Sequence, residues 1–161
     1  MTTNFAELLH ALVYANVDFI IVGGAAARAH GSARLTEDLD VVYRRSPENI
    51  ERIVKALAPY HPYLRGAPPG LPFHWNFDVV TNGLNFTLTV DIGAIDLFGE
   101  IIGGGGYEQL FPDAETIDLY GVKCLCLGLR KLVNVKRAAG RPKDLELIAE
   151  LEAIIEETES S

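Results

Sequence analysis

The sequence predicts an α+β fold, in which a mixed β-sheet is flanked by helices and followed by a C-terminal helical pair. Apolar residues recur with helical spacing over residues 4–16, which predicts an amphipathic helix. Residues 86–92 alternate strictly between apolar and polar side chains, which predicts a half-buried strand. Two helical segments, 127–138 and 142–157, follow one another near the end of the chain. This order favours a sheet with helices packed around it.

The N-terminal part is expected to contain, in order, a helix at 4–16, a strand at 18–22, a helix at 25–30, a strand at 39–43 and a helix from Ser46 to about Leu57. The first helix carries an apolar face formed by Phe5, Leu8, Leu9, Leu12 and Val13. The β-branched and aromatic run at 19–22 predicts a buried strand. Alanine favours the short helix, while Ser46 as N-cap and Pro47 at the first position begin the later one.

The C-terminal part is expected to contain a proline-rich irregular loop at 59–73, a meander of strands near 76–80, 84–92 and 95–101, a flexible glycine hinge at 103–106, strand-like segments at 115–119 and 122–126, and the two helices named above. Gly93 and Ala94 are expected to form the hairpin turn of the meander. Gly140 ends the first helix of the pair and Pro142 begins the second. Residues 1–157 are expected to form one domain, and 158–161 a frayed tail.

A glycine pair follows the first buried strand. Gly23 and Gly24 permit positive φ angles and a close approach of another group to the backbone. The start of the next helix offers free N–H groups, which can hold a phosphate oxygen. A plain strand-to-helix turn explains the same glycines, so this short pattern is a weak motif by itself.

Two aspartates open the second strand, fourteen residues after the glycine pair. Asp38 and Asp40 lie at positions i and i+2, so their side chains point to the same side of a strand and can face one cation together. Proteins bind Mg²⁺ with one or two carboxylates plus substrate phosphates. The glycine turn and the carboxylate pair together therefore predict a site for a metal-bound nucleoside triphosphate.

Two residues are candidates for a third carboxylate. Asp91 lies on the polar face of the alternating strand at 86–92. Asp96 stands between Ile95 and Leu97, and a carboxylate in such an apolar context needs a partner. Asp96 is the favoured candidate, and the strand register decides between the two.

The glycine and aspartate motif resembles the signature of the DNA polymerase β-like nucleotidyltransferase superfamily. The residues that carry this resemblance are Gly23-Gly24, His30-Gly31, Arg34, Thr36, Asp38 and Asp40. Further blocks at 65–73, 83–87, 95–100 and 136–144 are similar to family blocks, so that the resemblance covers most of residues 15–152. The chain looks most like the minimal bacterial branch, which includes toxin-type (abortive-infection) and antibiotic-modifying enzymes.

The resemblance implies a nucleotidyltransferase-like fold and the transfer of a nucleoside monophosphate from an NTP to a hydroxyl of RNA, protein or a small molecule. It implies Mg²⁺, or alternatively Mn²⁺, as the cofactor. The implied catalytic and metal-binding residues are Asp38, Asp40 and Asp96. The implied nucleotide-binding residues are Gly23, Gly24, Arg34, Thr36 and Lys136.

One departure from the superfamily keeps other functions open. Catalytic members usually carry Gly-Ser at the turn, where this chain has Gly23-Gly24-Ala25, a form that some members of the minimal branch share. A catalytically weak or inactive relative, acting as a nucleotide-binding or toxin–antitoxin partner, is therefore the alternative. A metal-dependent glycosyltransferase also uses Asp-x-Asp, but it does not account for the glycine turn upstream.

Net charge, apolar content and cysteine content indicate which classes of partner the chain is expected to have. The net charge of −8 argues against a protein that coats DNA, although six of the fourteen basic residues lie between Arg130 and Lys143. That basic segment is explained either by helix surface charge or by contact with a triphosphate or anionic acceptor. The sequence has no run of 18 apolar residues, which predicts no membrane span, and its two cysteines fit reduced thiols in a cytoplasmic protein. A homo-oligomer or a cognate protein partner is a further expectation.

Two ring side chains are expected to be structural. His30 stands at a predicted helix end, where hydrogen bonding is its commoner role. Trp75 follows the proline-rich loop and is expected to anchor it.

Overall fold

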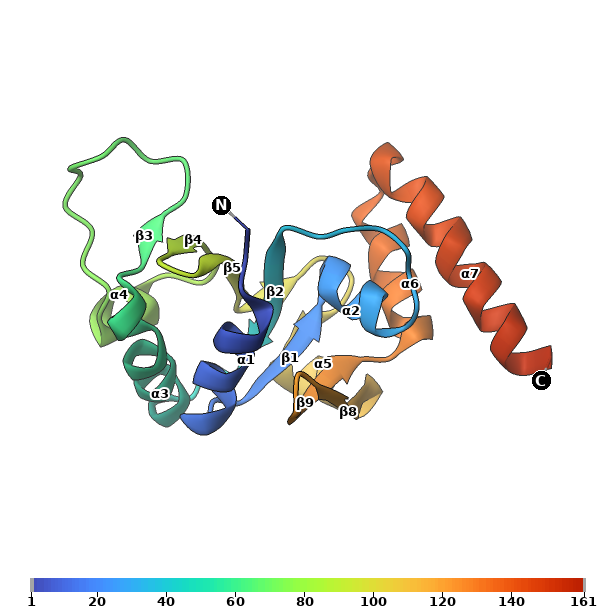
Figure 1. Cartoon of the computed structure of the whole chain (residues 1–161), viewed down its shortest axis with the longest axis horizontal. Coiled ribbons are helices and arrows are strands. Elements are labelled where there is room, and N and C mark those ends of the chain that lie inside the picture. The colour runs from blue at the N-terminus through green and yellow to red at the C-terminus, as the bar shows by residue number, and fades with distance from the viewer. Residues whose placement is uncertain (1, 161) are drawn as a thin grey trace.

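The structure is a computed structural model that describes residues 2–160, and it has a mixed β-sheet surrounded by helices (Figure 1). The α-helices are α1 (Phe5–Tyr14), α2 (Gly23–Ala29), α3 (Pro47–Leu57), α4 (Phe77–Asn82), α5 (Tyr107–Leu110), α6 (Leu129–Ala139) and α7 (Leu145–Ser160). The strands are β1 (Phe19–Val22), β2 (Asp38–Tyr43), β3 (Tyr63–Leu64), β4 (Phe86–Val90), β5 (Gly93–Phe98), β6 (Glu100–Ile101), β7 (Gly105–Gly106), β8 (Ala114–Leu119) and β9 (Val122–Leu127). The predicted α+β class is confirmed.

Seven strands form the main sheet, in the order β3-β4-β5-β2-β1-β9-β8. β2 pairs antiparallel with β1 on one side and parallel with β5 on the other. β1 pairs parallel with β9, so the sheet has both kinds of ladder. β2 therefore lies at the centre of the sheet, with β5, β4 and β3 on one side and β1, β9 and β8 on the other.

The core lies between this sheet and the helices that pack on it. Leu8, Leu9 and Leu12 of α1 are buried, which confirms the apolar face predicted for this helix. All four residues of β1 are buried, as its continuous apolar run predicts. α6 and α7 pack together at one end of the sheet, while the loop 65–76 projects at the opposite end (Figure 1). The loop 65–76 and the α6–α7 pair therefore lie on opposite sides of the central strands (Figure 1).

Three segments differ from the sequence prediction. Residues 76–80 were expected to form a strand, but α4 begins at Phe77 because the Asn76 side chain accepts a hydrogen bond of 2.9 Å from the Val79 N–H and caps a helix. The hairpin turn falls at residues 91–92 instead of Gly93-Ala94, because Val90 pairs with Gly93. The expected strand at 95–101 divides into β5 and β6.

The C-terminal third brings two further differences. The glycine segment 103–106 was expected to be a hinge, but Gly105 and Gly106 pair with Ile101 and Glu100 in a small hairpin. Helix α7 continues to Ser160, past the expected helix end at residue 157. Within residues 2–160, no helix is long and apolar enough to cross a bilayer.

Candidate metal and nucleotide site

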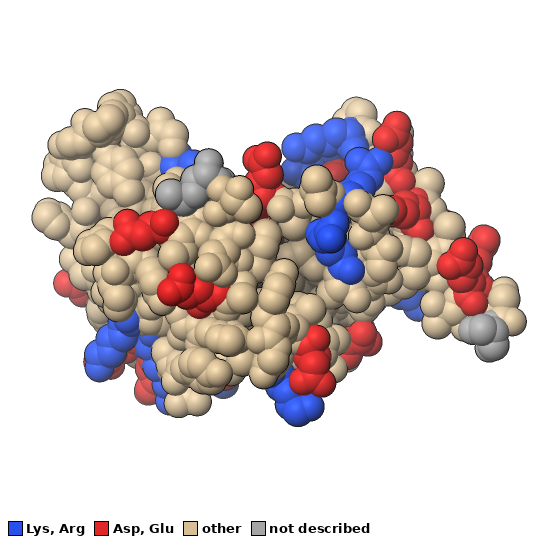
Figure 2. All heavy atoms as spheres, in the orientation of Figure 1, with Lys and Arg blue, Asp and Glu red and all other residues tan. Residues whose placement is uncertain are grey.

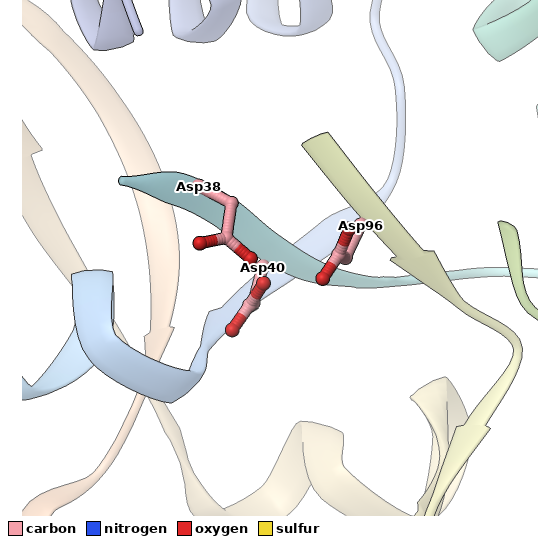
Figure 3. A group of neighbouring side chains, drawn as sticks. All are labelled: Asp38, Asp40 and Asp96. Atoms are coloured by element: carbon pink, nitrogen blue, oxygen red, sulfur yellow. The ribbon is translucent and has the colours of Figure 1, made fainter. Parts of the chain in front are cut away.

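Strand register brings three aspartates together at the centre of the sheet. Asp38 and Asp40 lie on the same side of β2, and Asp96 on β5 stands directly opposite Asp40. Figure 3 shows the three carboxyl groups gathered over the two strands. Each of them offers one oxygen within 4.8 Å of the other two. We call these three residues the acidic cluster.

Asp91 lies outside the acidic cluster. It follows β4 in the turn at residues 91–92, and its Oδ2 is 2.6 Å from Nδ1 of His61. The Asp91 side chain is 55% exposed, whereas that of Asp96 is 16% exposed. The third carboxylate beside Asp38 and Asp40 is therefore Asp96, the candidate that the sequence favoured.

The acidic cluster has perturbed electrostatics. Burial, with the negative charges of Asp38 and Asp96 added to it, raises the pKa of Asp40 to about 8. Burial also raises the pKa of Asp96, and Asp38 adds to this effect while the Arg65 guanidinium opposes it. Among the described residues, none hydrogen-bonds to the buried Oδ1 of Asp40. The cluster thus concentrates negative charge that a cation would stabilise.

Arg65 supplies a cation to this cluster, and the sequence analysis did not select it as a site residue. Its Nη2 donates to Oδ1 of Asp96, and its Nη1 lies 3.7 Å from Oδ2 of Asp38. One signal could have pointed to it, since Arg65 is the sole Lys or Arg between Lys55 and Lys123. An isolated arginine in a long uncharged-to-acidic stretch is a candidate partner for buried carboxylates.

The glycine pair lies directly beneath the acidic cluster. Gly23 has φ +63°, and a Cβ there would collide with the Asp40 carboxylate. A Cβ at Gly24 would lie 2.8 Å from Oγ1 of Thr36, and that hydroxyl donates a 3.2 Å hydrogen bond to the Asp38 carbonyl oxygen. Helix α2 begins at Gly23, two residues earlier than expected. Gly23, Gly24 and Thr36 therefore lie against the aspartates, as the sequence grouped them.

The two basic residues selected from the sequence take different positions. The Lys136 side chain is 13% exposed, its Nζ is 3.9 Å from Oδ1 of Asp144, and its positive charge acts to lower the pKa of Asp40. Arg34 instead forms a 2.8 Å ion pair with Glu146 on α7. Lys136 thus acts electrostatically on the acidic cluster. Arg34 instead links the segment before β2 to helix α7.

Most of the basic segment at 130–143 is paired within the chain. Arg130 contacts Glu159, Arg137 contacts Glu152, and Arg141 lies 2.7 Å from Asp144. Figure 2 shows Lys and Arg side chains gathered where α6 passes into α7, with acidic side chains directly beside them. The helix-surface interpretation accounts for these pairs.

His30, Trp75 and the cysteines have structural surroundings. His30 Nε2 is 2.8 Å from the Leu127 carbonyl oxygen, at the end of α2. The Trp75 indole donates a 3.0 Å hydrogen bond to the Val54 carbonyl and packs edge-on against Phe86, so it anchors the loop as predicted. Both thiols are free and buried, and burial raises the pKa of Cys126 to about 12, which disfavours the thiolate needed of a nucleophile.

No protein-family model matches the chain, and no curated protein matches it either. The function is therefore argued from the acidic cluster and the residues around it.

Proposed function

We propose that the chain is a divalent-metal-dependent nucleotidyltransferase, which moves a nucleoside monophosphate from an NTP to an acceptor hydroxyl. One observation supports this most strongly. Three carboxylates from two parallel strands meet above a glycine turn, and one of them carries a buried oxygen for which the described residues provide no partner. Burial of ionised carboxylates is unfavourable unless the groups are protonated or paired, and a bound cation would stabilise the ionised form.

The donor set fits a hard divalent cation. Carboxylate oxygens are the ligands that Mg²⁺ and Mn²⁺ prefer, and Mg²⁺ is commonly held by one or two carboxylates together with substrate phosphates. Asp38, Asp40 and Asp96 would hold the ion. When bound, it would polarise the phosphoryl oxygens and offset the charge that develops on them during transfer.

The neighbouring residues would hold the nucleotide and move one proton. The absence of side chains at Gly23 and Gly24 lets the Asp40 carboxylate and the Thr36 hydroxyl lie against the backbone. The backbone N–H groups of this turn would hold a phosphate oxygen. Lys136 would offset negative charge near Asp40. The acceptor oxygen forms its bond to the α-phosphorus, the bond to pyrophosphate breaks, and the hydroxyl proton passes to Asp96.

A nucleotide-binding protein without turnover is the second candidate. Ala25 follows the glycine pair, so this turn has no hydroxyl to hold a terminal phosphate. Such a protein would bind an NTP and act as a regulator or as a toxin–antitoxin partner.

Transfer of a labelled nucleotide tests the proposal. The protein is incubated with each α-labelled NTP, Mg²⁺ and fractionated cell extract, in parallel with Asp40→Asn and Asp91→Asn. Asp91 is the matched control because it is an aspartate outside the acidic cluster. We expect label to move to RNA, protein or a small molecule with the wild type and Asp91→Asn, and no transfer with Asp40→Asn.

Equal transfer by Asp40→Asn would refute the catalytic assignment. If no variant transfers label but the wild type binds an NTP, the second candidate replaces the first.

A further inference from the structure

Arg65 belongs to a row of residues that crosses the sheet. The Arg65 N–H donates a 3.0 Å hydrogen bond to the Thr87 carbonyl oxygen, which extends the pairing of β3 with β4 by one residue. Thr87 stands opposite Asp96, and Asp96 stands opposite Asp40. The backbone of Arg65 is therefore fixed relative to the acidic cluster by the ladder itself.

The guanidinium of Arg65 competes for the oxygens that a metal ion would use. It contacts both Asp38 and Asp96, the outer members of the cluster. A divalent ion and a guanidinium repel each other, so each opposes binding of the other at these carboxylates. Binding of the ion to Asp38 and Asp96 would thus favour a position of the guanidinium farther from them.

The surroundings of Arg65 allow its side chain to move while its backbone stays in place. Its side chain is 29% exposed, so it can turn toward solvent at the open side of the cluster. Gly66 follows with φ +85° and no described atom within 4 Å of a Cβ placed there. The far end of the loop is held by the hydrogen bond between Trp75 and Val54. Rotation of the Arg65 side chain toward solvent would separate its guanidinium from the two carboxylates while the backbone stays paired with Thr87.

Arg65 also has donor capacity that its present contacts do not use. Its Nε is buried, and no acceptor among residues 2–160 satisfies it. A guanidinium has five N–H donors in a planar fork that matches the geometry of phosphate oxygens. Once the ion holds the carboxylates, the nearest strong acceptors would be the phosphates that the same ion carries.

We propose that Arg65 is a substrate-binding residue that leaves Asp38 and Asp96 when the divalent ion binds, and then pairs with a phosphate oxygen of the metal-bound triphosphate. This inference rests on the proposed function. It predicts that Arg65 opposes binding of the ion alone and favours binding of the ion together with the triphosphate.

Metal titrations separate these two effects. Free Mn²⁺ is followed by electron paramagnetic resonance as it binds to the wild type, Arg65→Gln and Arg44→Gln. Arg44 is the matched control, an arginine paired with Asp18 and Glu108. Each titration is repeated with the α,β-methylene analogues of the nucleoside triphosphates, which bind without being cleaved at the reacting bond.

We expect opposite changes in Arg65→Gln. Binding of Mn²⁺ alone should tighten by about tenfold, as the loss of one charge-assisted hydrogen bond allows. Binding of the Mn²⁺-bound analogue should weaken by about tenfold for the same reason. Arg44→Gln should resemble the wild type. Arg65→Lys, which keeps the charge but lacks the fork, should fall between the two and serves if Arg65→Gln does not fold.

Other results would overturn the inference. If Arg65→Gln binds both Mn²⁺ alone and the Mn²⁺-bound analogue more tightly, Arg65 is only a counter-ion. If it binds both more weakly, the role of Arg65 is to hold the site together. If neither changes, it has no part in binding. A wild type that binds Mn²⁺ but no analogue would count against the proposed function itself, which is a different result from binding that Arg65 does not affect.

Discussion

Replacing Asp40 with asparagine should make the metal-free protein more stable at alkaline pH. Burial is the main reason that the pKa of Asp40 rises from 3.8 to about 8, with Asp38 and Asp96 contributing. Between about pH 4 and pH 8, the Asp40 carboxyl is ionised in the unfolded chain but still protonated in the folded chain. The free energy of unfolding therefore falls as the pH rises through this range, and the decrease ends above the folded pKa.

The size of this effect follows from the shift. Each pKa unit corresponds to about 1.4 kcal/mol, so three units between pH 5 and pH 8 give at most about 4 kcal/mol. We expect roughly half of that limit, because charged groups and water rearrange around a buried carboxylate. Asparagine has nearly the same shape and does not ionise, so Asp40→Asn lacks this term at every pH.

Urea unfolding of both proteins at a series of pH values, with a chelator present, measures the difference. Asp40→Asn should gain about 2 kcal/mol over the wild type between pH 5 and pH 8, of the order set by the linkage above. Groups that do not interact with Asp40 titrate alike in both proteins and cancel. The electrostatic interaction of Asp40 with Asp38 and Asp96 is lost in the variant and forms part of the measured difference. A difference that stays constant over this range would refute the raised pKa and the electrostatic argument for the acidic cluster.

Two other predictions concern residues that shape the site and its support. In urea titrations, Gly23→Ala should lower the free energy of unfolding by more than Gly140→Ala does. The φ angles at the two positions are +63° and +65°, but only at Gly23 does the Asp40 carboxylate occupy the place of the new Cβ. We expect the loss of stability in Gly23→Ala to be larger by about 1 to 3 kcal/mol, and equal losses in the two variants would mean that this contact is unimportant. Asn49→Ala should cost about 2 to 3 kcal/mol by the same assay, because the fully buried Asn49 side chain bonds the backbone of Asp18 (2.6 and 3.0 Å) and of Arg44 (2.8 Å). A loss below about 0.5 kcal/mol would show that these backbone groups find other partners.

The sequence predicted the parts of the site that depend on local periodicity. The spacing of Asp38 and Asp40 placed them on one side of a strand, and the apolar neighbours of Asp96 marked it as a buried carboxylate in need of partners. The pairing of β2 with β5, which puts Asp96 opposite Asp40, is a tertiary choice that no local pattern encodes.

Residues in loops and short segments were predicted less well. The ion pairs of Arg65 depend on where an irregular loop leaves β3, and no periodicity describes that path. Residues 76–80 have the composition of a strand, and the single cap at Asn76 decides for a helix. Arg34 was grouped with the nucleotide site by resemblance, and the structure pairs it with Glu146 on a helix far along the chain.

The parallel pairing of β2 with β5 also has a kinetic consequence. Residues 41–95 separate Asp40 from its partner Asp96, and a parallel pair cannot be joined by a tight turn. Helix α3, the loop 65–76 and strand β4 all lie between these two residues in the chain. Contacts between distant parts of a chain form slowly, because the loop entropy is lost before the contact stabilises it. The acidic cluster therefore depends on a long-range contact, and a chain in which β2 and β5 are not yet paired would lack the site formed by the three carboxylates.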